Sequence, residues 1–272
     1  LPLVFYRCDD EYANVIAHPR HGYGKNANPC IDCKIFFLQK AKEYMGKLNA
    51  SFVITGEVVG QRPMSQYKSM LKHIEKECGL EGLLLRPLSA KLLPPTIPEL
   101  EGIVDRNRLY AIAGRSRDTQ FELAQEFGIT QFQSPAGGCF LTMPQLASRV
   151  KDLIEHPPFN ALDLFLANVG RHYRLHEHAK IIVARNENEC TILQRYKQTA
   201  DFFVEPSFKG PVIYGKGTIL QSDYPVLVQI LARYGKPSPD ENSVALFIRG
   251  HHTTTLVTDN PIDDATLSKM RI

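Results

Sequence analysis

Three cysteines are the residues of this sequence whose types and spacing best fit a reactive site. Cys30 and Cys33 form a CxxC pair that opens into a long helical pattern, and Cys139 follows two glycines in residues 134–142. Glycines let the backbone turn sharply and bring a thiol close to a ligand or cluster. We therefore predict that Cys30, Cys33 and Cys139 converge on one site.

The spacing of these thiols points to metal or sulfur chemistry. A thiolate at a helix N-terminus is stabilised by the helix dipole, so we expect Cys33 to be more acidic than a free cysteine. No second CxxC completes a four-cysteine zinc site. With Cys139 added, three thiolates would leave one iron of a 4Fe–4S cluster open for sulfide or substrate. The alternative is a redox or incidental CxxC pair, with Cys139 as a small buried hydrophobe.

The other cysteines and the histidines give weaker signals. Cys8, Cys78 and Cys190 lie in or beside predicted elements without a partner, and we interpret them as packing residues. The histidines at 172, 176 and 178 lack the carboxylate or cysteine pattern of a metal site, so we predict a solvated surface cluster.

The elements that must position the CxxC pair are typical of a parallel α/β sheet. Short apolar runs at residues 2–6 and 51–56 predict strands buried on both faces, and apolar residues recur at helical spacing over 34–48. Strand, loop, helix and strand in this order make a right-handed crossover. Ligands bind at the carboxyl ends of such strands, where Thr55, Gly56 and Glu57 end the second strand.

The middle of the chain adds helices and an arginine cluster. Helical patterns occupy residues 66–78, 106–113, 119–127 and 143–155, with an irregular connection at 83–98. The cluster comprises Arg106, Arg108, Arg115 and Arg117. These side chains fit phosphate contacts equally as well as solvated helix faces.

A break at Pro157-Pro158 predicts two domains, residues 1–156 and 160–272. The second reads as a smaller α+β unit with a closing hairpin. We predict helices at 187–196 and 224–234, and strands at 180–183, 202–204, 212–214, 244–248 and 254–257.

Composition is that of an ordinary soluble globular protein. A length of 272 residues fits two domains at roughly 100–200 residues each. No apolar run approaches the roughly 18 residues of a membrane helix. Six cysteines, two of them as CxxC, fit metal or redox chemistry in a reducing compartment, so we expect a cytoplasmic protein.

Residues 1 to about 150 resemble the PP-loop ATPase family of tRNA thiouridine synthetases. The segment Asn28-Pro29-Cys30-x-x-Cys33 is similar to the NPCxxC motif of tRNA 2-thiouridylase-like enzymes. Gly138-Cys139-Phe140 resembles their downstream cysteine motif, and residues 52–56 resemble the strand end beside the nucleotide. The resemblance implies a Rossmann-like HUP domain that uses ATP with Mg²⁺ to adenylate a uridine carbonyl of tRNA before sulfur attacks.

One motif of that family is missing from these residues. The phosphate-binding SGGxDS loop does not occur in the sequence, and Leu1 would correspond to a later strand. We therefore expect either that an N-terminal segment is lacking or that ATP hydrolysis has been lost. The resemblance places Thr55, Gly56 and Glu57 beside the nucleotide.

Residues from about 160 onward show a fainter resemblance to the RNA-binding domain of NFACT proteins. It rests on residues 182–188, a following helix and the strand at 201–204. It implies a module that delivers tRNA, with Arg185, Arg195 and Lys197 as phosphate contacts. Arg185 thereby joins Arg106, Arg108, Arg115 and Arg117 as a candidate RNA-binding residue.

Together these observations predict a tRNA sulfurtransferase supplied by a protein or sulfide donor. Cys30, Cys33 and Cys139 would hold a 4Fe–4S cluster or, in a rival mechanism, Cys139 would carry a persulfide that Cys30 or Cys33 releases. Two other hypotheses remain: a non-catalytic RNA-binding protein derived from such an enzyme, and a structural zinc site at the CxxC pair. The sequence leaves the modified position and the oligomeric state open.

Overall fold

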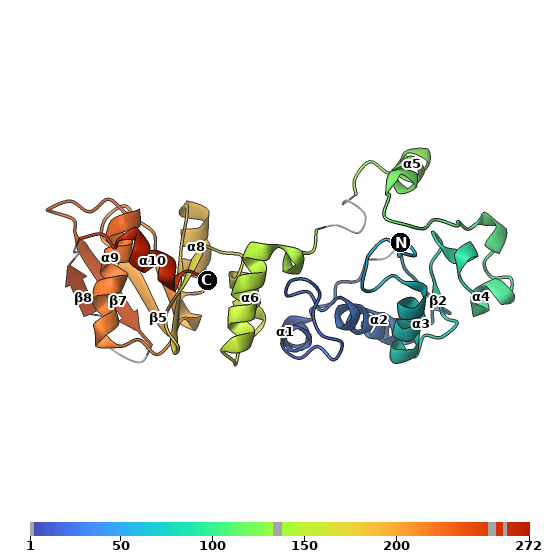
Figure 1. The fold of residues 1–272 in the computed structure, drawn as a ribbon, viewed down its shortest axis with the longest axis horizontal. Coiled ribbons are helices and arrows are strands. Elements are labelled where there is room, and N and C mark those ends of the chain that lie inside the picture. The colour runs from blue at the N-terminus through green and yellow to red at the C-terminus, as the bar shows by residue number, and fades with distance from the viewer. Residues whose placement is uncertain (1–2, 133–137, 250–253, 258–259) are drawn as a thin grey trace. The chain divides into compact units, whose positions relative to one another are not determined.

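The structure is a computed structural model that describes residues 3–132, 138–249, 254–257 and 260–272. It divides into two compact units, Leu1–Ala147 and Ser148–Ile272, which we describe separately (Figure 1). Helix α6 (Pro144–Glu155) spans the division in the sequence. None of the helices in the described ranges combines the length and apolar character that a membrane crossing needs.

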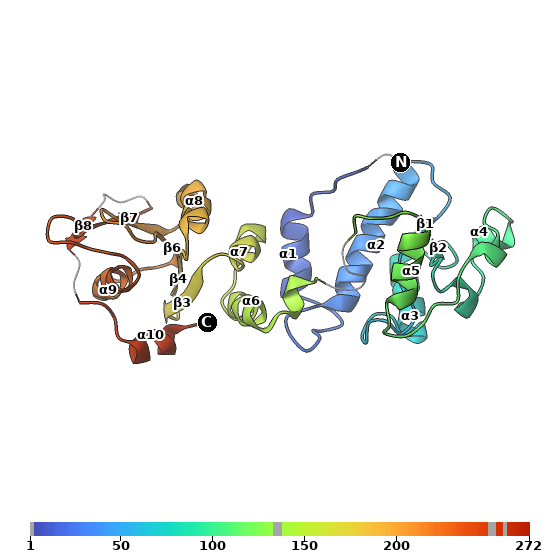
Figure 2. The ribbon, with the colours of Figure 1, turned by 90° about the horizontal axis from the view of Figure 1, so that it is seen from above.

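Three helices form the centre of the N-terminal unit. Helix α2 (Cys30–Lys47) packs against both α1 (Asp9–Ala17) and α3 (Lys68–Cys78), as Figures 1 and 2 show. Strands β1 (Val53–Ile54) and β2 (Leu84–Leu85) pair in parallel. Because α3 lies between them in the sequence, the unit contains one short β-α-β crossover.

The remainder of the N-terminal unit consists of short elements and irregular chain. Its α-helices are α4 (Ile97–Leu100) and α5 (Asp118–Glu126), and its 3₁₀ turns are η1 (Ala90–Leu92), η2 (Arg106–Arg108) and η3 (Phe140–Thr142). Helix α5 buries none of its residues.

The interior face of α2 differs from the predicted stripe. The helix begins at Cys30, four residues before the predicted start, so Ile31, Ile35 and Leu38 form the buried i, i+4, i+7 row. They pack with Ile74 of α3 and with neighbours in β2. Phe37, one of the apolar residues that recur at helical spacing over 34–48, is instead 50% exposed.

Two predictions for the N-terminal unit are wrong, and a third is met only in part. Residues 3–6 of the predicted first strand are irregular and exposed, with Phe5 at 85%, while Leu1 and Pro2 lie outside the described residues. The predicted helix at 106–113 is a single 3₁₀ turn, capped by the Asp105 side chain. A parallel-sheet domain was expected, but the described residues contain only the β1–β2 pair. Apolar runs form buried strands only where neighbouring elements cover them.

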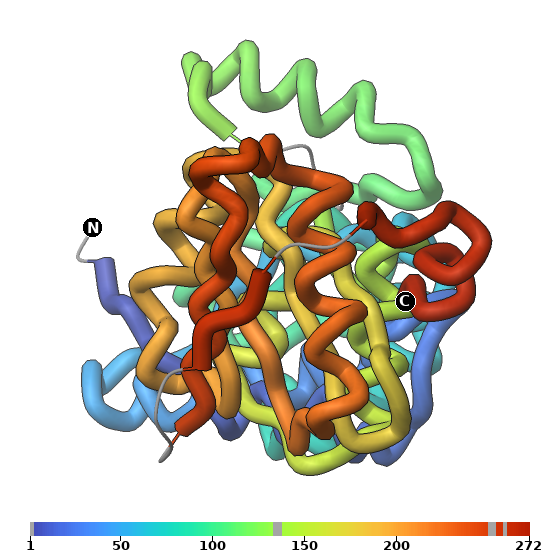
Figure 3. The backbone as a smooth tube through the Cα atoms, turned by 90° about the vertical axis from the view of Figure 1, so that its left-hand side faces the viewer, coloured from blue at the N-terminus to red at the C-terminus, as the bar shows by residue number. Residues whose placement is uncertain are grey.

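A six-stranded antiparallel sheet organises the C-terminal unit, in the order β3-β4-β6-β5-β7-β8. Its strands lie side by side in Figure 3, coloured yellow to red. They are β3 (Arg171–His176), β4 (Ala179–Val183), β5 (Phe202–Pro206), β6 (Ile213–Gly217), β7 (Ser243–Ile248) and β8 (Thr254–Val257).

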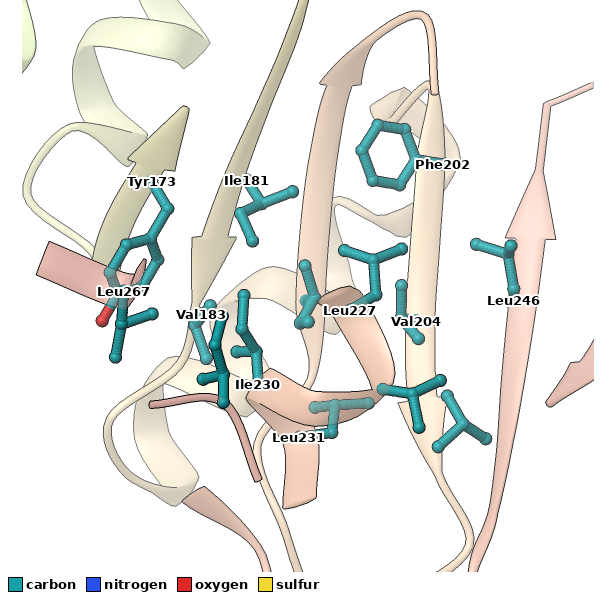
Figure 4. Packing of buried hydrophobic residues seen from close by; sticks show 14 of the residues in the cluster. Tyr173, Ile181, Val183, Phe202, Val204, Leu227, Ile230, Leu231, Leu246 and Leu267 are labelled. Atoms are coloured by element: carbon teal, nitrogen blue, oxygen red, sulfur yellow. The ribbon is translucent and has the colours of Figure 1, made fainter. Parts of the chain in front are cut away.

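Helices cover both faces of this sheet. Alternate strand residues such as Ile181, Val204 and Leu246 pack with α9 (Tyr224–Tyr234) and α10 (Asp264–Met270), as Figure 4 shows. The intervening residues form a second cluster on the opposite face, against α7 (Ala161–Leu166) and α8 (Glu187–Arg195). The 3₁₀ turns η4 (Lys197–Thr199) and η5 (Gln221–Asp223) complete the unit. The period of two along each strand thus fills two cores.

Candidate functional site

Cys30 and Cys33 both lie in the first turn of α2 rather than in the loop before it. Pro29 is the N-cap, and its carbonyl accepts a hydrogen bond from the Cys33 backbone N–H at 2.8 Å. The buried Asn28 side chain donates through Nδ2 to Cys30 Sγ at 3.1 Å. These contacts fix the pair at the positive end of the helix dipole.

The Cys139 segment comes to the same place through a contact distant in sequence. Asn26 Nδ2 donates to the Thr142 carbonyl at 2.6 Å, and Thr142 lies in the turn capped by Cys139. A charge on Cys139 would raise the pKa of Cys33, as would a charge on Cys30. Cys33 therefore lies within electrostatic reach of each of the other two thiols. Residues 134–137 of the predicted loop lie outside the described residues.

The acidity expected for Cys33 is wrong in direction. Burial raises the pKa of the Cys33 thiol and outweighs the Tyr12 hydrogen bond, which lowers it, with Sγ and the hydroxyl 3.2 Å apart. Neighbouring thiolates add to the rise, and Lys34 opposes it. The sequence identified the helix N-terminus but could not show that the thiol is desolvated there. Cys33 is therefore a neutral thiol near pH 7.

Tyr12 is a residue of this site that sequence reasoning missed. Burial raises its pKa well above the ordinary value, and charges on Cys33 and Cys139 raise it further. Its ring packs on Phe36 and Phe37 of α2, with centroids 5.8 and 5.5 Å away. The neutral hydroxyl is thus held where it can donate to a thiolate at Cys33.

The three thiols are of the right donor type for iron or zinc, but their arrangement does not form a ligand set. Across the described ranges, no group of three or more His, Cys, Asp and Glu side chains is placed to hold a metal ion. We therefore derive no reaction step through a cluster.

The residues predicted beside the nucleotide form an internal ion-pair network. Glu57 is buried, with Oε1 2.5 Å from Lys34 Nζ and Oε2 2.9 Å from Arg86 Nε. Thr55 Oγ1 also donates to Glu57 at 3.2 Å. Although burial alone would raise it, the two cations lower the pKa of Glu57. Glu57 therefore ties α2 to the β2 segment, while a Cβ at Gly56 would meet no atom within 4 Å.

A chain of polar side chains starts from Asp32, between the two cysteines. Its carboxylate accepts hydrogen bonds from the backbone N–H groups of Arg20 and His21 at 2.9 and 3.0 Å. His21 Nδ1 lies 3.0 Å from Asp32, and His21 Nε2 lies 3.0 Å from His73 Nε2 on α3. In the sequence, Asp32 was distinguished only by its position inside the CxxC pair.

The predicted RNA-binding arginines divide into bonded and exposed groups. Arg106 bonds to Glu99 at 2.5 Å and to the carbonyls of Ala90 and Leu93, so it supports its own loop. Arg185 pairs with Glu189. The remaining three are Arg108 and Arg115, which are exposed, and Arg117, which is half-buried with its Nε unpartnered among the described residues.

His172, His176 and His178 do not form the predicted solvated cluster. His172 has 2% of its surface exposed and its Nε2 lies 2.8 Å from the Val169 carbonyl. Burial lowers the pKa of His172 far below its ordinary value, helped by Lys180 and Arg149. His176 and His178 do lie near the surface, with ring centroids 6.3 Å apart. The prediction failed at His172 because β3 turns that side chain inward.

Comparison with known proteins places the C-terminal unit. Residues 170–271 match the family described as "NFACT protein RNA binding domain". The C-terminal unit is thus similar to the RNA binding domain of NFACT proteins. The match covers β3 to α10, and so confirms the fainter of the two sequence resemblances.

The other comparisons add little to the RNA binding domain. No curated protein matches the chain. A solved structure of the C-terminal part of the fibronectin/fibrinogen-binding protein from Streptococcus suis is 12% identical, with 89% of this chain and 94% of that chain covered at a TM-score of 0.30. That score supports no conclusion. No comparison supports the thiouridine synthetase resemblance of residues 1 to about 150, which stays a prediction.

Proposed function

We propose that this chain binds RNA through its C-terminal unit and transfers sulfur to a uridine of that RNA from cysteines of the N-terminal unit. The RNA binding domain at residues 170–271 carries the first half of the proposal. The electrostatic influence of Cys30 and Cys139 on Cys33 supports the second. The substrate class is tRNA, as the motif resemblance implies, and the protein acts as a sulfurtransferase.

Cys139 is the sulfur carrier in this proposal. Its thiolate attacks the outer sulfur of a donor persulfide. The rest of the donor leaves as a thiolate, and Cys139 then carries the persulfide. The outer sulfur then attacks a uridine carbon whose oxygen has been adenylated by ATP with Mg²⁺, and AMP leaves with that oxygen. The product is an RNA–S–S–Cys139 disulfide.

Cys33 is the resolving thiol. As a thiolate it attacks Cys139 Sγ, so a Cys33–Cys139 disulfide forms and the sulfur remains on the RNA as a thiocarbonyl. Two thiols thus supply the two electrons, and a cellular dithiol resets the protein. Because its raised pKa keeps Cys33 neutral, Tyr12 stabilises the thiolate when it forms. Cys30 is the alternative resolving thiol, steered by Asn28.

The adenylation step draws on other groups. Glu57 is neutralised by Lys34 and Arg86, so we assign it a structural role under the nucleotide-facing strand end. Gly56 leaves open space there for the close approach of a nucleotide.

The test loads sulfur before any RNA is present. The full chain, purified without oxygen, is treated with glutathione persulfide, and the cysteine peptides are weighed by mass spectrometry. We expect one added sulfur on the Cys139 peptide, its loss in Cys139→Ala, and its retention in Cys190→Ala. Addition of tRNA transcript, ATP and Mg²⁺ should then form thiouridine, and Cys33→Ala should keep sulfur on Cys139 without releasing it.

Iron, zinc and acid-labile sulfide per chain separate the two sulfur routes. Iron and sulfide in near-equal amounts, lost in Cys139→Ala, would replace the persulfide route with the 4Fe–4S cluster. Zinc lost together with the fold in Cys30→Ala would instead indicate a structural site.

A second function, RNA binding without sulfur transfer, is favoured by one observation. Desolvation keeps Cys33 protonated, which is the opposite of an activated thiol. A wild-type chain that binds tRNA but takes up neither sulfur nor iron would establish this second function.

A further inference from the structure

A groove on the RNA binding domain gathers several cations from separate elements. It lies where β3 begins, where β4 leads into α8, and where the 207–212 connection meets the end of α9, and it encloses about 700 Å³. Its charged lining residues are Arg171, Arg185, Glu187, Lys209 and Lys236, and its aromatic ones are Phe208 and Tyr234. The unit as a whole carries nearly equal numbers of acids and bases, so this excess is local.

Two loops hold the lysines of the groove together. The Lys236 backbone N–H donates to the Lys209 carbonyl at 2.9 Å, and both side chains are exposed. The close approach of the two loops depends on Gly235, because a Cβ at that position would lie 2.5 Å from the Phe208 ring and 2.8 Å from the Leu231 carbonyl. The backbone therefore fixes the spacing of two cations whose ammonium groups reach solvent.

A fixed aromatic ring lies beside these lysines. The guanidinium carbon of Arg171 lies 4.5 Å from the centroid of Tyr234, and the Tyr234 hydroxyl lies 2.9 Å from that of Tyr173. Arginine and tyrosine planes held in this way are the surfaces on which proteins stack unpaired bases.

Little negative charge opposes the cations. Glu189 forms an ion pair with Arg185, so Glu187 is the acidic residue among the lining residues named above. We propose that this groove binds a single-stranded segment of the RNA, with phosphates on Lys209 and Lys236 and a base on the Arg171–Tyr234 pair. The proposal rests on the RNA-binding half of the proposed function and adds the face and the RNA class.

A single strand fits these features better than a duplex. Bases in a duplex are already stacked and cannot reach a ring inside a groove, whereas an unpaired loop can present both its bases and its phosphates. A cluster of cations without the ring would bind RNA of any form by charge alone.

The experiment measures binding of a fluorescent oligouridine of about twelve nucleotides to the full chain at several salt concentrations. Lys209→Gln/Lys236→Gln should weaken binding about tenfold and lower the salt slope by about 1.4, because each single-strand phosphate contact contributes roughly 0.7. The matched control is Lys151→Gln/Lys269→Gln, which removes the same charge from exposed sites of the same unit. It should change the dissociation constant less than about twofold.

The ring is tested with a conservative change. Arg171→Lys keeps the charge but loses the stacked plane, so it should weaken oligouridine several-fold and leave an abasic strand of equal length unaffected. Thermal unfolding of each variant confirms that the fold is intact. Equal effects of the two lysine pairs, or competition by duplex RNA as strong as by single strands, would overturn the groove assignment. Failure of the wild-type chain to bind any RNA would instead overturn the proposed function.

Discussion

The two units of this protein bury their apolar residues in different ways. In the C-terminal unit, helices cover both faces of a six-stranded sheet, and the strands contribute side chains to both cores. In the N-terminal unit, the described residues form one two-stranded sheet, and large apolar side chains such as Phe5, Leu100 and Phe127 are more than half exposed. Regular strand alternation therefore produces a self-contained core, whereas isolated apolar runs do not.

The units nevertheless share one device, a buried carboxylate held by two cations. In the C-terminal unit, Asp152 lies 2.6 and 2.8 Å from Arg174 nitrogens and 2.8 Å from Lys180 Nζ. In the N-terminal unit, Glu57 has the same arrangement with Lys34 and Arg86. Each carboxylate joins segments distant in the sequence.

Loss of these carboxylates should have the largest effects. Asp152→Asn should cost the C-terminal unit about 3–5 kcal/mol, because Lys180 is left buried without a countercharge. Glu57→Gln should cost the N-terminal unit less, since Arg86 keeps its pair with Glu75. Amide hydrogen exchange, followed separately for each unit, measures the loss of stability in both variants.

The pH dependence of the Asp152 effect has a definite sign. Burial alone would raise the pKa of Asp152, but Arg174 and Lys180 lower it overall. A depressed carboxyl pKa stabilises the fold above the unfolded pKa, and this stability is lost as pH falls through the folded value. Asp152→Asn should therefore weaken the acid dependence. The exposed Asp240→Asn is the control, and an equal effect there would contradict the prediction.

Truncation of one apolar side chain in each unit should have the next largest difference in effect on stability. Leu246 in β7 is fully buried and Leu100 in α4 is 73% exposed. Leu246→Ala should cost about 2–5 kcal/mol by leaving a cavity, and Leu100→Ala should stay within about 0.5 kcal/mol. Urea unfolding measures the difference. Comparable losses would mean that Leu100 is covered in solution.

The same contrast explains how far the sequence predicts the fold. The apolar runs of β4 to β8 and the stripes of α3 and α9 have strong local patterns, and all of these elements were predicted. Strand β3 was missed because Arg171–His176 is rich in basic and histidine residues, and only its pairing with β4 turns Tyr173 inward. Residues 3–6 show the reverse error, an apolar run without a covering element.

The candidate site was predictable to the same limited degree. Residue type and spacing led to the prediction that Cys30, Cys33 and Cys139 share one site, and this stays a prediction. Tyr12 and the Asp32–His21–His73 chain depend on packing between α1, α2 and α3, which no local pattern specifies. The pKa of Cys33 depends on desolvation for the same reason.

Each unit also buries a titratable group that is neutral near pH 7, Cys33 in the N-terminal unit and His172 in the C-terminal unit. We expect the larger effect of substitution at His172. Burial, Lys180 and Arg149 depress the pKa of His172, while Asp152 opposes them. Below the ordinary histidine pKa, the unfolded chain takes up a proton that the folded chain does not. The free energy of unfolding should therefore decrease by about 1.4 kcal/mol for each unit by which the pH is lowered. His172→Gln should remove this slope between neutral pH and about pH 5. The exposed His178→Gln should retain it, and similar slopes in both variants would exclude the assignment.

The smallest effect is expected at the thiol itself. Tyr12→Phe keeps the ring packed on Phe36 and Phe37 but removes the hydroxyl that lies 3.2 Å from Cys33 Sγ. The pKa of Cys33, already raised by burial, should rise further. A hydrogen bond of about 1 kcal/mol corresponds to roughly fivefold slower alkylation by iodoacetamide near neutral pH. Peptide mass spectrometry follows Cys33, with the half-buried Cys190 of the other unit as internal reference. An unchanged rate at Cys33 would show that Tyr12 only packs against α2, and the thiolate would then need another donor.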